Sequence, residues 1–256
     1  MKENIETIPL LKAFEAKDEC PFCNLAREAE QHAISFILGS AYMEDDIREQ
    51  TDKTGFCRHH FKMMYDYGNR LGSALILSTH LHKLNQELAQ EIKNFSPGKS
   101  SVLKRFKHTD ATAQLTPSTN IGAWAASKKD SCYVCDHFNN IYGRYLDTFF
   151  DLYRKDEEFR KMFAESKGVC IPHFGDLVEV AERRLNDAQQ KEFYPVAFSL
   201  MQENMKRLEE EVCWFVEKND YLNKDKPWGN SQDSIQRGIQ KCTGGYPADE
   251  IFKAKL

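Results

Sequence analysis

The chain has 256 residues and a formal net charge of −4, with 41% hydrophobic, 12% aromatic and 29% charged residues. This composition allows a sizeable buried core and gives no general reason to expect nucleic acid as a partner. The sequence contains no run of 18 apolar residues and no export signal, so we expect no membrane span and a cytoplasmic location. One short basic cluster is interpreted as a solvated linker segment. It consists of Lys99, Lys104, Arg105, Lys107 and His108.

An internal repeat organises the chain, and cysteine motifs mark it. A CxxC motif at residues 20–23 recurs 112 residues later, at residues 132–135. A CxxH motif at residues 57–60 recurs 113 residues later, at residues 170–173. The flanks keep the same register, including a glycine two residues before each CxxH motif. Two motif pairs with nearly equal internal gaps predict two related halves.

The apolar pattern of the first half predicts helices. Residues 24–38 follow the first CxxC motif with a helical spacing of apolar side chains. Residues 57–93 continue in three- and four-residue apolar steps without proline, which predicts one long helix. Residues 96–130 are poorer in pattern, and the segment 112–120 is predicted to be a loop because it is rich in Thr, Ser, Pro and Asn.

The second half repeats this pattern with a difference after its CxxH motif. Residues 136–153 mirror the first helix, and residues 171–185 predict a shorter helix. A break near Asn186 precedes a long helix that ends near Asn219, so we expect two helices here against one in the first half. A short helix capped by Ser231 follows in the tail.

These patterns predict an all-α helical bundle built from two pseudo-repeats, each with its own CxxC…CxxH metal site. The first repeat is expected at residues 1–98 and a linker at residues 99–131. The second repeat and the C-terminal tail are expected at residues 132–256.

The two motifs together predict metal binding. Zinc prefers four tetrahedral ligands, commonly thiolates and imidazoles, and a CxxC turn joined to a CxxH helix start supplies three sulfurs and one nitrogen. The first site is predicted to contain Cys20, Cys23, Cys57 and His60, and the second Cys132, Cys135, Cys170 and His173. We expect two structural zinc ions per chain, because four protein ligands leave no open position for catalysis. Iron, an iron–sulfur cluster, a redox dithiol or plain buried cysteines remain alternatives.

Other histidines and cysteines are interpreted as ordinary residues. Only His60 has a counterpart in the second motif, so His59 is expected beside the site or at the surface. His80 and His82 are expected at the surface. Cys213 lies on an apolar helix stripe and is expected in the core. For Cys242 the pattern predicts nothing.

The sequence resembles an uncharacterised bacterial family of helical proteins. The resemblance rests on the CxxC motif at 20–23, the segments 55–61 and 68–72, the motif at 168–173 and the C-terminal run 214–230. It covers most of the chain except the central loop and implies no established activity. Some relatives carry a transporter substrate-binding label, against which the missing export signal and the helical pattern argue.

Three functions remain open. The saturated ligand shells favour a non-enzymatic, zinc-stabilised scaffold that binds another protein. The alternative is a thiol-based redox protein or zinc-release sensor, because a CxxC motif at a helix start also suits dithiol chemistry. The third is a helical enzyme or small-ligand binder with a pocket between the halves, for which no catalytic constellation is visible. Nucleic-acid binding ranks last because it rests on the basic cluster alone.

Overall fold

The computed structural model describes residues 5–96 and 117–254, and these residues form helices and turns without a strand. The predicted all-α class is therefore confirmed. The basic cluster at residues 99–108 and part of the predicted central loop lie outside the described residues. The chain divides into two compact units, of which the first contains residues 1–30 and 138–250 and the second contains residues 31–137 and 251–256. Each unit thus draws on both halves of the sequence.

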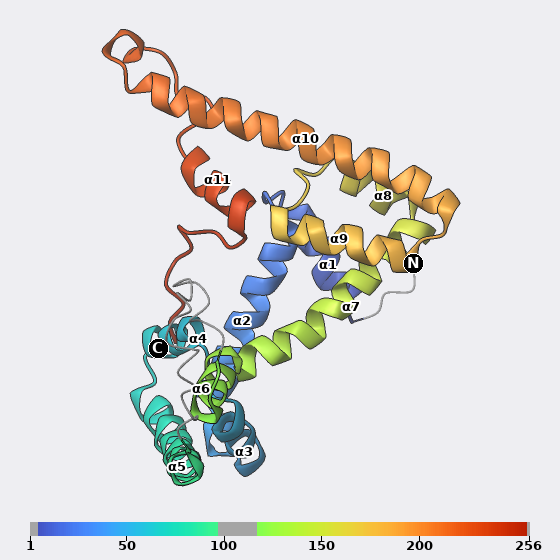
Figure 1. The fold of residues 1–256 in the computed structure, drawn as a ribbon. Helices are drawn as coiled ribbons and strands as arrows, with labels where there is room; N and C mark the ends of the chain where they lie inside the picture. Colours follow the sequence, from blue (N-terminus) through green and yellow to red (C-terminus); the bar gives the residue numbers. More distant parts are fainter. Residues whose placement is uncertain (1–4, 97–116, 255–256) are drawn as a thin grey trace, which may run out of the picture. The chain divides into compact units, whose positions relative to one another are not determined.

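The first unit contains most of the C-terminal helices (Figure 1). Its elements are α1 (Thr7–Glu15), the start of α2 (Pro21–Gly39), most of α7 (Tyr133–Lys155), α8 (Glu157–Ala164), α9 (Ile171–Arg184), α10 (Asp187–Lys218), η4 (Tyr221–Asn223) and α11 (Ser234–Thr243). Its core is a cluster of aromatic rings whose centroids lie 5.0–6.4 Å apart in edge-on and stacked pairs. The fully buried members are Phe22, Phe149, Phe150, Phe159, Phe163 and Phe193. The α7 residues Phe149, Phe150 and Tyr153 therefore pack in this core.

The second unit is smaller and encloses a separate core. Its elements are the end of α2, η1 (Ala41–Met43), α3 (Asp45–Thr54), α4 (Arg58–Tyr67), α5 (Arg70–Asn94), α6 (Asn120–Asp130) and the start of α7. The core joins apolar residues of α2 to the cysteines that begin α7, among them Ile34, Ile37 and Cys132. The second CxxC motif is therefore packed against first-half residues.

The long helix expected at residues 57–93 is interrupted, which corrects the prediction. Gly68 adopts a left-handed conformation with φ of +97° and ends α4. Asn69 then caps α5 by accepting a hydrogen bond from the backbone N–H of Gly72. The two halves consequently agree, because Asn186 begins α10 in the same way through a capping box with Gln189.

The C-terminal end also differs in detail. Ser231 does not cap α11, because this helix begins at Ser234 and Asp233 occupies the capping position. Gly244, with φ of +79°, ends α11.

Candidate metal centres

The structure gathers all eight predicted ligands into two clusters, but it joins the motifs across the repeats. Each cluster combines the CxxC motif of one half with the CxxH motif of the other. The first cluster contains Cys20, Cys23, Cys170 and His173, and the second contains Cys57, His60, Cys132 and Cys135. The expected grouping of motifs within each half is therefore wrong.

Helix length explains this exchange. Cys20 immediately precedes α2, which has 19 residues and extends about 28 Å. The chain then passes through α3 before it reaches Cys57, in the second unit. In the same way the 23 residues of α7 extend about 34 Å from Cys132, in the second unit, and Cys170 follows in the first. A long helix after each CxxC motif carries the chain away from that motif.

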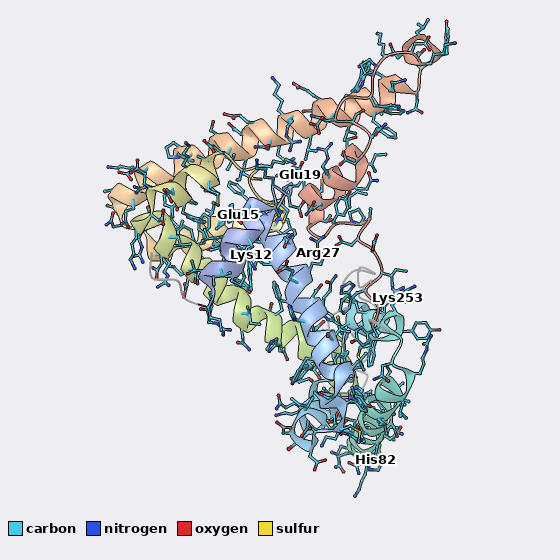
Figure 2. All side chains as sticks on the ribbon, turned by 180° about the vertical axis from the view of Figure 1, so that it is seen from behind. Lys12, Glu15, Glu19, Arg27, His82 and Lys253 are labelled. Carbon is cyan, nitrogen blue, oxygen red and sulfur yellow. The ribbon has the colours of Figure 1, made fainter. Side chains whose placement is uncertain are left out.

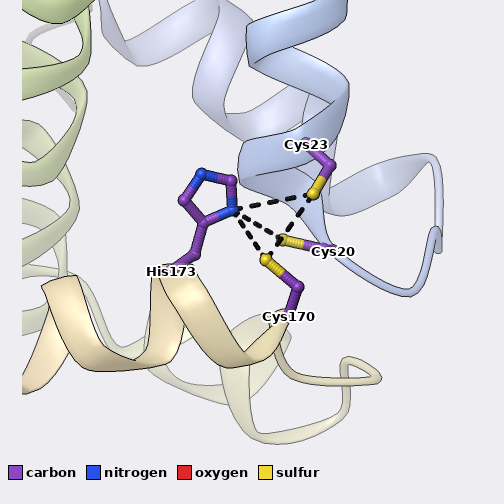
Figure 3. Close-up of side chains that lie close together, drawn as sticks. All are labelled: Cys20, Cys23, Cys170 and His173. Carbon is purple, nitrogen blue, oxygen red and sulfur yellow. Dashed lines mark hydrogen bonds between the residues drawn. The ribbon is translucent and has the colours of Figure 1, made fainter. Parts of the chain in front are cut away.

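The first cluster has nearly the dimensions of a tetrahedral zinc shell (Figure 3). Nδ1 of His173 lies 3.2 Å from Sγ of Cys20, 3.6 Å from Sγ of Cys23 and 3.1 Å from Sγ of Cys170. The sulfurs of Cys23 and Cys170 lie 3.7 Å apart. Bonds of about 2.3 Å to sulfur and 2.0 Å to nitrogen would separate ligand atoms by about 3.5–3.8 Å. Small movements would therefore admit one ion among these four atoms.

The second cluster repeats this geometry. Nδ1 of His60 lies 3.2 Å from Sγ of Cys57, 3.2 Å from Sγ of Cys132 and 3.5 Å from Sγ of Cys135. The sulfurs of Cys57 and Cys135 lie 3.9 Å apart. Both of these cysteines are partly exposed, whereas all three cysteines of the first cluster are buried. The second cluster is therefore the more accessible of the two.

Matching backbone conformations position the CxxH motifs. Cys57 and Cys170 are the N-cap residues of α4 and α9, with φ/ψ of −69°/167° and −72°/163°. Two residues earlier, Gly55 and Gly168 have φ of +63° and +71°. Each histidine thus lies one helical turn beyond its cysteine, and the helix N-terminus favours the thiolate form of the cysteine.

The thiols of each cluster perturb one another. Hydrogen bonds from Cys20 and Cys23 lower the pKa of the Cys170 thiol to about 4, while burial raises the pKa of Cys20 well above its usual range. The pKa of the Cys132 thiol is lowered to about 6. Burial alone would raise this pKa, but hydrogen bonds with His60 and with backbone N–H groups outweigh the effect of burial. Burial, together with the neighbouring Cys132, raises the pKa of Cys135. Without a cation, such clusters favour one thiolate among neutral thiols, and a metal ion supplies the charge that lets all three ionise.

Helix α11 supports the first cluster. Lys241 is 1% exposed, and its ammonium donates to the backbone carbonyls of Glu19, 2.8 Å away, and Lys167, 2.5 Å away. These carbonyls belong to the two loops that lead into Cys20 and Cys170. After the helix, the N–H of Gly245 points at Sγ of Cys23 at 3.4 Å. Lys241 thus ties together the two loops that carry the ligands.

A glycine loop supports the second cluster. The carbonyl of Gly55 accepts a hydrogen bond of 2.9 Å from the N–H of Tyr133, inside the CxxC motif. A Cβ at Gly55 would lie 2.6 Å from the ring of His80. His80 is buried, with Nδ1 2.9 Å from the carbonyl oxygen of Asp52, so its predicted surface position is wrong. In the sequence, His80 lies four residues after Ile76 and four residues before Leu84. This position on the apolar face of the helix could have revealed that His80 is buried.

The remaining candidates lie as follows. His59 is exposed, and its ring centroid lies 5.1 Å from that of His60, which agrees with a position beside the site. His82 is exposed as expected. Cys213 is exposed rather than buried, so the core assignment is wrong, and Cys242 is exposed too.

The exposed cysteines provide an internal reference for metal protection. We expect Cys213 and Cys242 to react rapidly with a thiol-alkylating reagent in the metal-loaded protein, while the six clustered sulfurs stay unmodified. After chelation we expect Cys57 and Cys135 to react before the buried Cys20 and Cys170. Mass spectrometry of peptides sampled over time checks this order. A free redox dithiol predicts the opposite result, namely a CxxC pair that reacts without chelation.

None of the described helices combines the length and apolar character that crossing a membrane requires. The chain matches a family of unknown function, DUF6062, over residues 1–249, and it therefore belongs to that family. It is also similar to a protein of Caldicellulosiruptor sp. (strain Rt8B.4) named "Uncharacterized 23.9 kDa protein in xynA 3'region", with 24% identity over 210 residues, or 81% of this chain and 85% of the relative. No solved structure matches the chain. The resemblance inferred from the motifs is confirmed.

Proposed function

We propose that this member of the family is a zinc-binding helical scaffold with two structural Cys3His sites. One observation supports the proposal above all: each cluster brings three sulfurs and one imidazole nitrogen within 4.8 Å of one another. Such a set fills a tetrahedral shell, and a filled shell is typical of structural rather than catalytic zinc. Sulfur-rich tetrahedral sites suit zinc better than magnesium or calcium, which prefer oxygen ligands.

In this proposal the ions connect the two sequence halves. Each ion holds a CxxC motif from one half against a CxxH motif from the other, so metal binding joins segments about 150 and about 75 residues apart. Metal binding then supplies folding energy to both units. The proposed partner is another protein rather than a nucleic acid or a membrane. The proposed compartment is a reducing one such as the cytoplasm, where clustered thiols remain available for metal.

Metal analysis and folding measurements test the proposal together. We expect protein purified without added metal to carry two zinc ions per chain by elemental analysis. Removing them with a strong chelator should abolish most of the cooperative thermal transition and reduce the helical circular dichroism signal, and adding zinc should restore both. Adding magnesium should restore neither. Full helicity and an unchanged thermal midpoint in the metal-free protein would contradict the structural role.

A further inference from the structure

Helix α5 carries an exposed stripe of apolar side chains at coiled-coil spacing. Positions 71, 74, 78, 81, 85, 88, 92 and 95 follow one another in alternating steps of three and four residues, which is the a/d pattern of a heptad repeat. We call these eight positions the α5 seam. Seven of them lie on α5, namely Leu71, Ala74, Ser78, Leu81, Asn85, Leu88 and Ile92, and the eighth is Phe95, the extended residue that follows the helix.

All eight seam residues are exposed to solvent, although α5 is part of a folded unit. Leu71 is 65% exposed, Ile92 59% and Leu81 48%. The opposite face of α5, which includes Ile76 and His80, packs into the unit. The seam therefore adds nothing to the core of its unit. With the adjacent Leu77 it exposes on the order of 500 Å² of apolar side chain, at the upper end of what monomeric proteins show.

The residues that flank the seam carry little charge. The e and g positions along the helix hold Leu75, Leu77, His82, Leu84, Ala89 and one charged residue, Glu91. His82, labelled on α5 in Figure 2, marks this flank. Charged side chains such as Lys83 and Lys93 occupy positions outside the seam and its flanks. A flank with a single charged residue, near the end of the helix, gives two copies of the chain little reason to repel each other.

The seam is also complementary to itself in shape. When two copies run in opposite directions, Ala74 faces Ile92 and Ser78 faces Leu88, so each small side chain meets a large one. A parallel pair would place Ala74 on Ala74 and Ser78 on Ser78, which leaves one end poorly filled. The antiparallel arrangement also opposes the two helix dipoles.

We propose that the α5 seam is a homodimer interface in which a second copy of the chain packs its α5 antiparallel to the first. Two copies would bury about 1,000 Å² through these side chains, close to the lower limit for a specific interface. Ser78 and Asn85 are the two polar residues of the seam, and in this register they face Leu88 and Leu81 of the second copy. The interface involves neither metal cluster, so it is independent of the zinc proposal.

The oligomeric state of the full, metal-loaded chain tests the interface. We expect a dimer by sedimentation equilibrium, and we expect the combined variant Leu81→Glu/Leu88→Glu to raise the dimer dissociation constant at least about 100-fold. Because both leucines are exposed, the variant should keep its metal content and helicity. The matched control Gln90→Glu adds a charge off the seam and should leave the dimer unchanged. A wild-type monomer at about 100 µM, or a dimer indifferent to the seam variant, would overturn the proposal.

Cross-linking tests the antiparallel arrangement separately. We expect Ser78→Cys protein mixed with Leu88→Cys protein to form a disulfide-linked pair through positions 78 and 88, while each variant alone gives no link at the new cysteine. Peptide mapping distinguishes this bond from any link through Cys213 or Cys242. Self-linking of Ser78→Cys alone would indicate a parallel pair and overturn the proposed orientation.

Discussion

Combining Cys20→Ser with Cys170→Ser is expected to leave one metal ion per chain, whereas combining Cys20→Ser with Cys57→Ser is expected to leave none. The first pair removes two ligands from one cluster, and the second removes one ligand from each. Pairing of motifs within each repeat would reverse these outcomes. Elemental analysis after gel filtration in the presence of a weak chelator measures the difference.

The effect on stability should be equally large. Structural zinc sites contribute about 10–16 kcal/mol of apparent binding free energy, while whole domains are stable by about 5–15 kcal/mol. Loss of one ion should therefore unfold much of the unit that holds it. We expect Cys20→Ser/Cys170→Ser to lose cooperative melting of the phenylalanine-rich first unit and to keep the second.

A matched control separates metal loss from cysteine loss. Cys213→Ser/Cys242→Ser also replaces two cysteines, but both are exposed and outside the clusters. We expect this variant to keep two ions and the thermal midpoint of the wild type within about 2 °C. Equal metal loss in both cysteine-pair variants that include Cys20 would contradict the exchanged pairing.

Local patterns predicted the helices and the ligand types, but the pairing of the motifs depends on three-dimensional geometry. The repeat selected His60 over His59, and the structure places Nδ1 of His60 among three sulfurs. Because α2 and α7 are long, each CxxC motif lies in a different unit from the CxxH motif of its own half. The spacing between motifs, which is nearly the same in both halves, contains no information about that choice.

The misplaced helix end has a different cause. Residues 57–93 keep an apolar period across Gly68 and Asn69, and periodicity alone joins them into one helix. The break depends on a glycine at positive φ and an asparagine that accepts from Gly72, which is ordinary capping chemistry at an unexpected position. The pattern of Gly followed by Asn was visible in the sequence, and it outweighs the apolar period. The prediction that Cys213 lies in the core was wrong because an apolar stripe can face solvent near the end of a long helix, as it does in α10.

Replacing Lys241 by Met is expected to weaken the first metal centre and to spare the second. Lys241 contacts the carbonyls of Glu19 and Lys167, and its ammonium lies 3.6 Å from Oε2 of Glu19. The side chain of Glu19, labelled in Figure 2 beside α11, is fully buried. Its carboxylate also pairs with Arg207 at 2.6 Å and Arg237 at 3.2 Å. Removing one member of such a buried network costs about 3–5 kcal/mol, because other charges and carbonyls lose their partner.

Lys241 holds the loops that carry Cys20 and Cys170, so its loss should also affect the metal ion. Three thiolates, a neutral imidazole and a zinc ion carry a net charge of −1, and Lys241 places a positive charge on the loops beside them. Residues that orient metal ligands commonly change metal affinity about 10–100-fold when replaced. We therefore expect Lys241→Met to release one of the two ions about 10–100 times more readily in competition with a chromogenic chelator.

The control is a lysine with a carboxylate partner at the surface. Lys161 is 76% exposed and lies 3.8 Å from Glu165, so Lys161→Met should change the free energy of unfolding by less than about 0.5 kcal/mol and leave both ions in place. If Lys241→Met lowered stability but released both ions at the wild-type rate, Lys241 would serve packing alone. Faster release of a single ion, with Cys20 becoming reactive before Cys57, would identify Lys241 as the residue that positions the first metal centre.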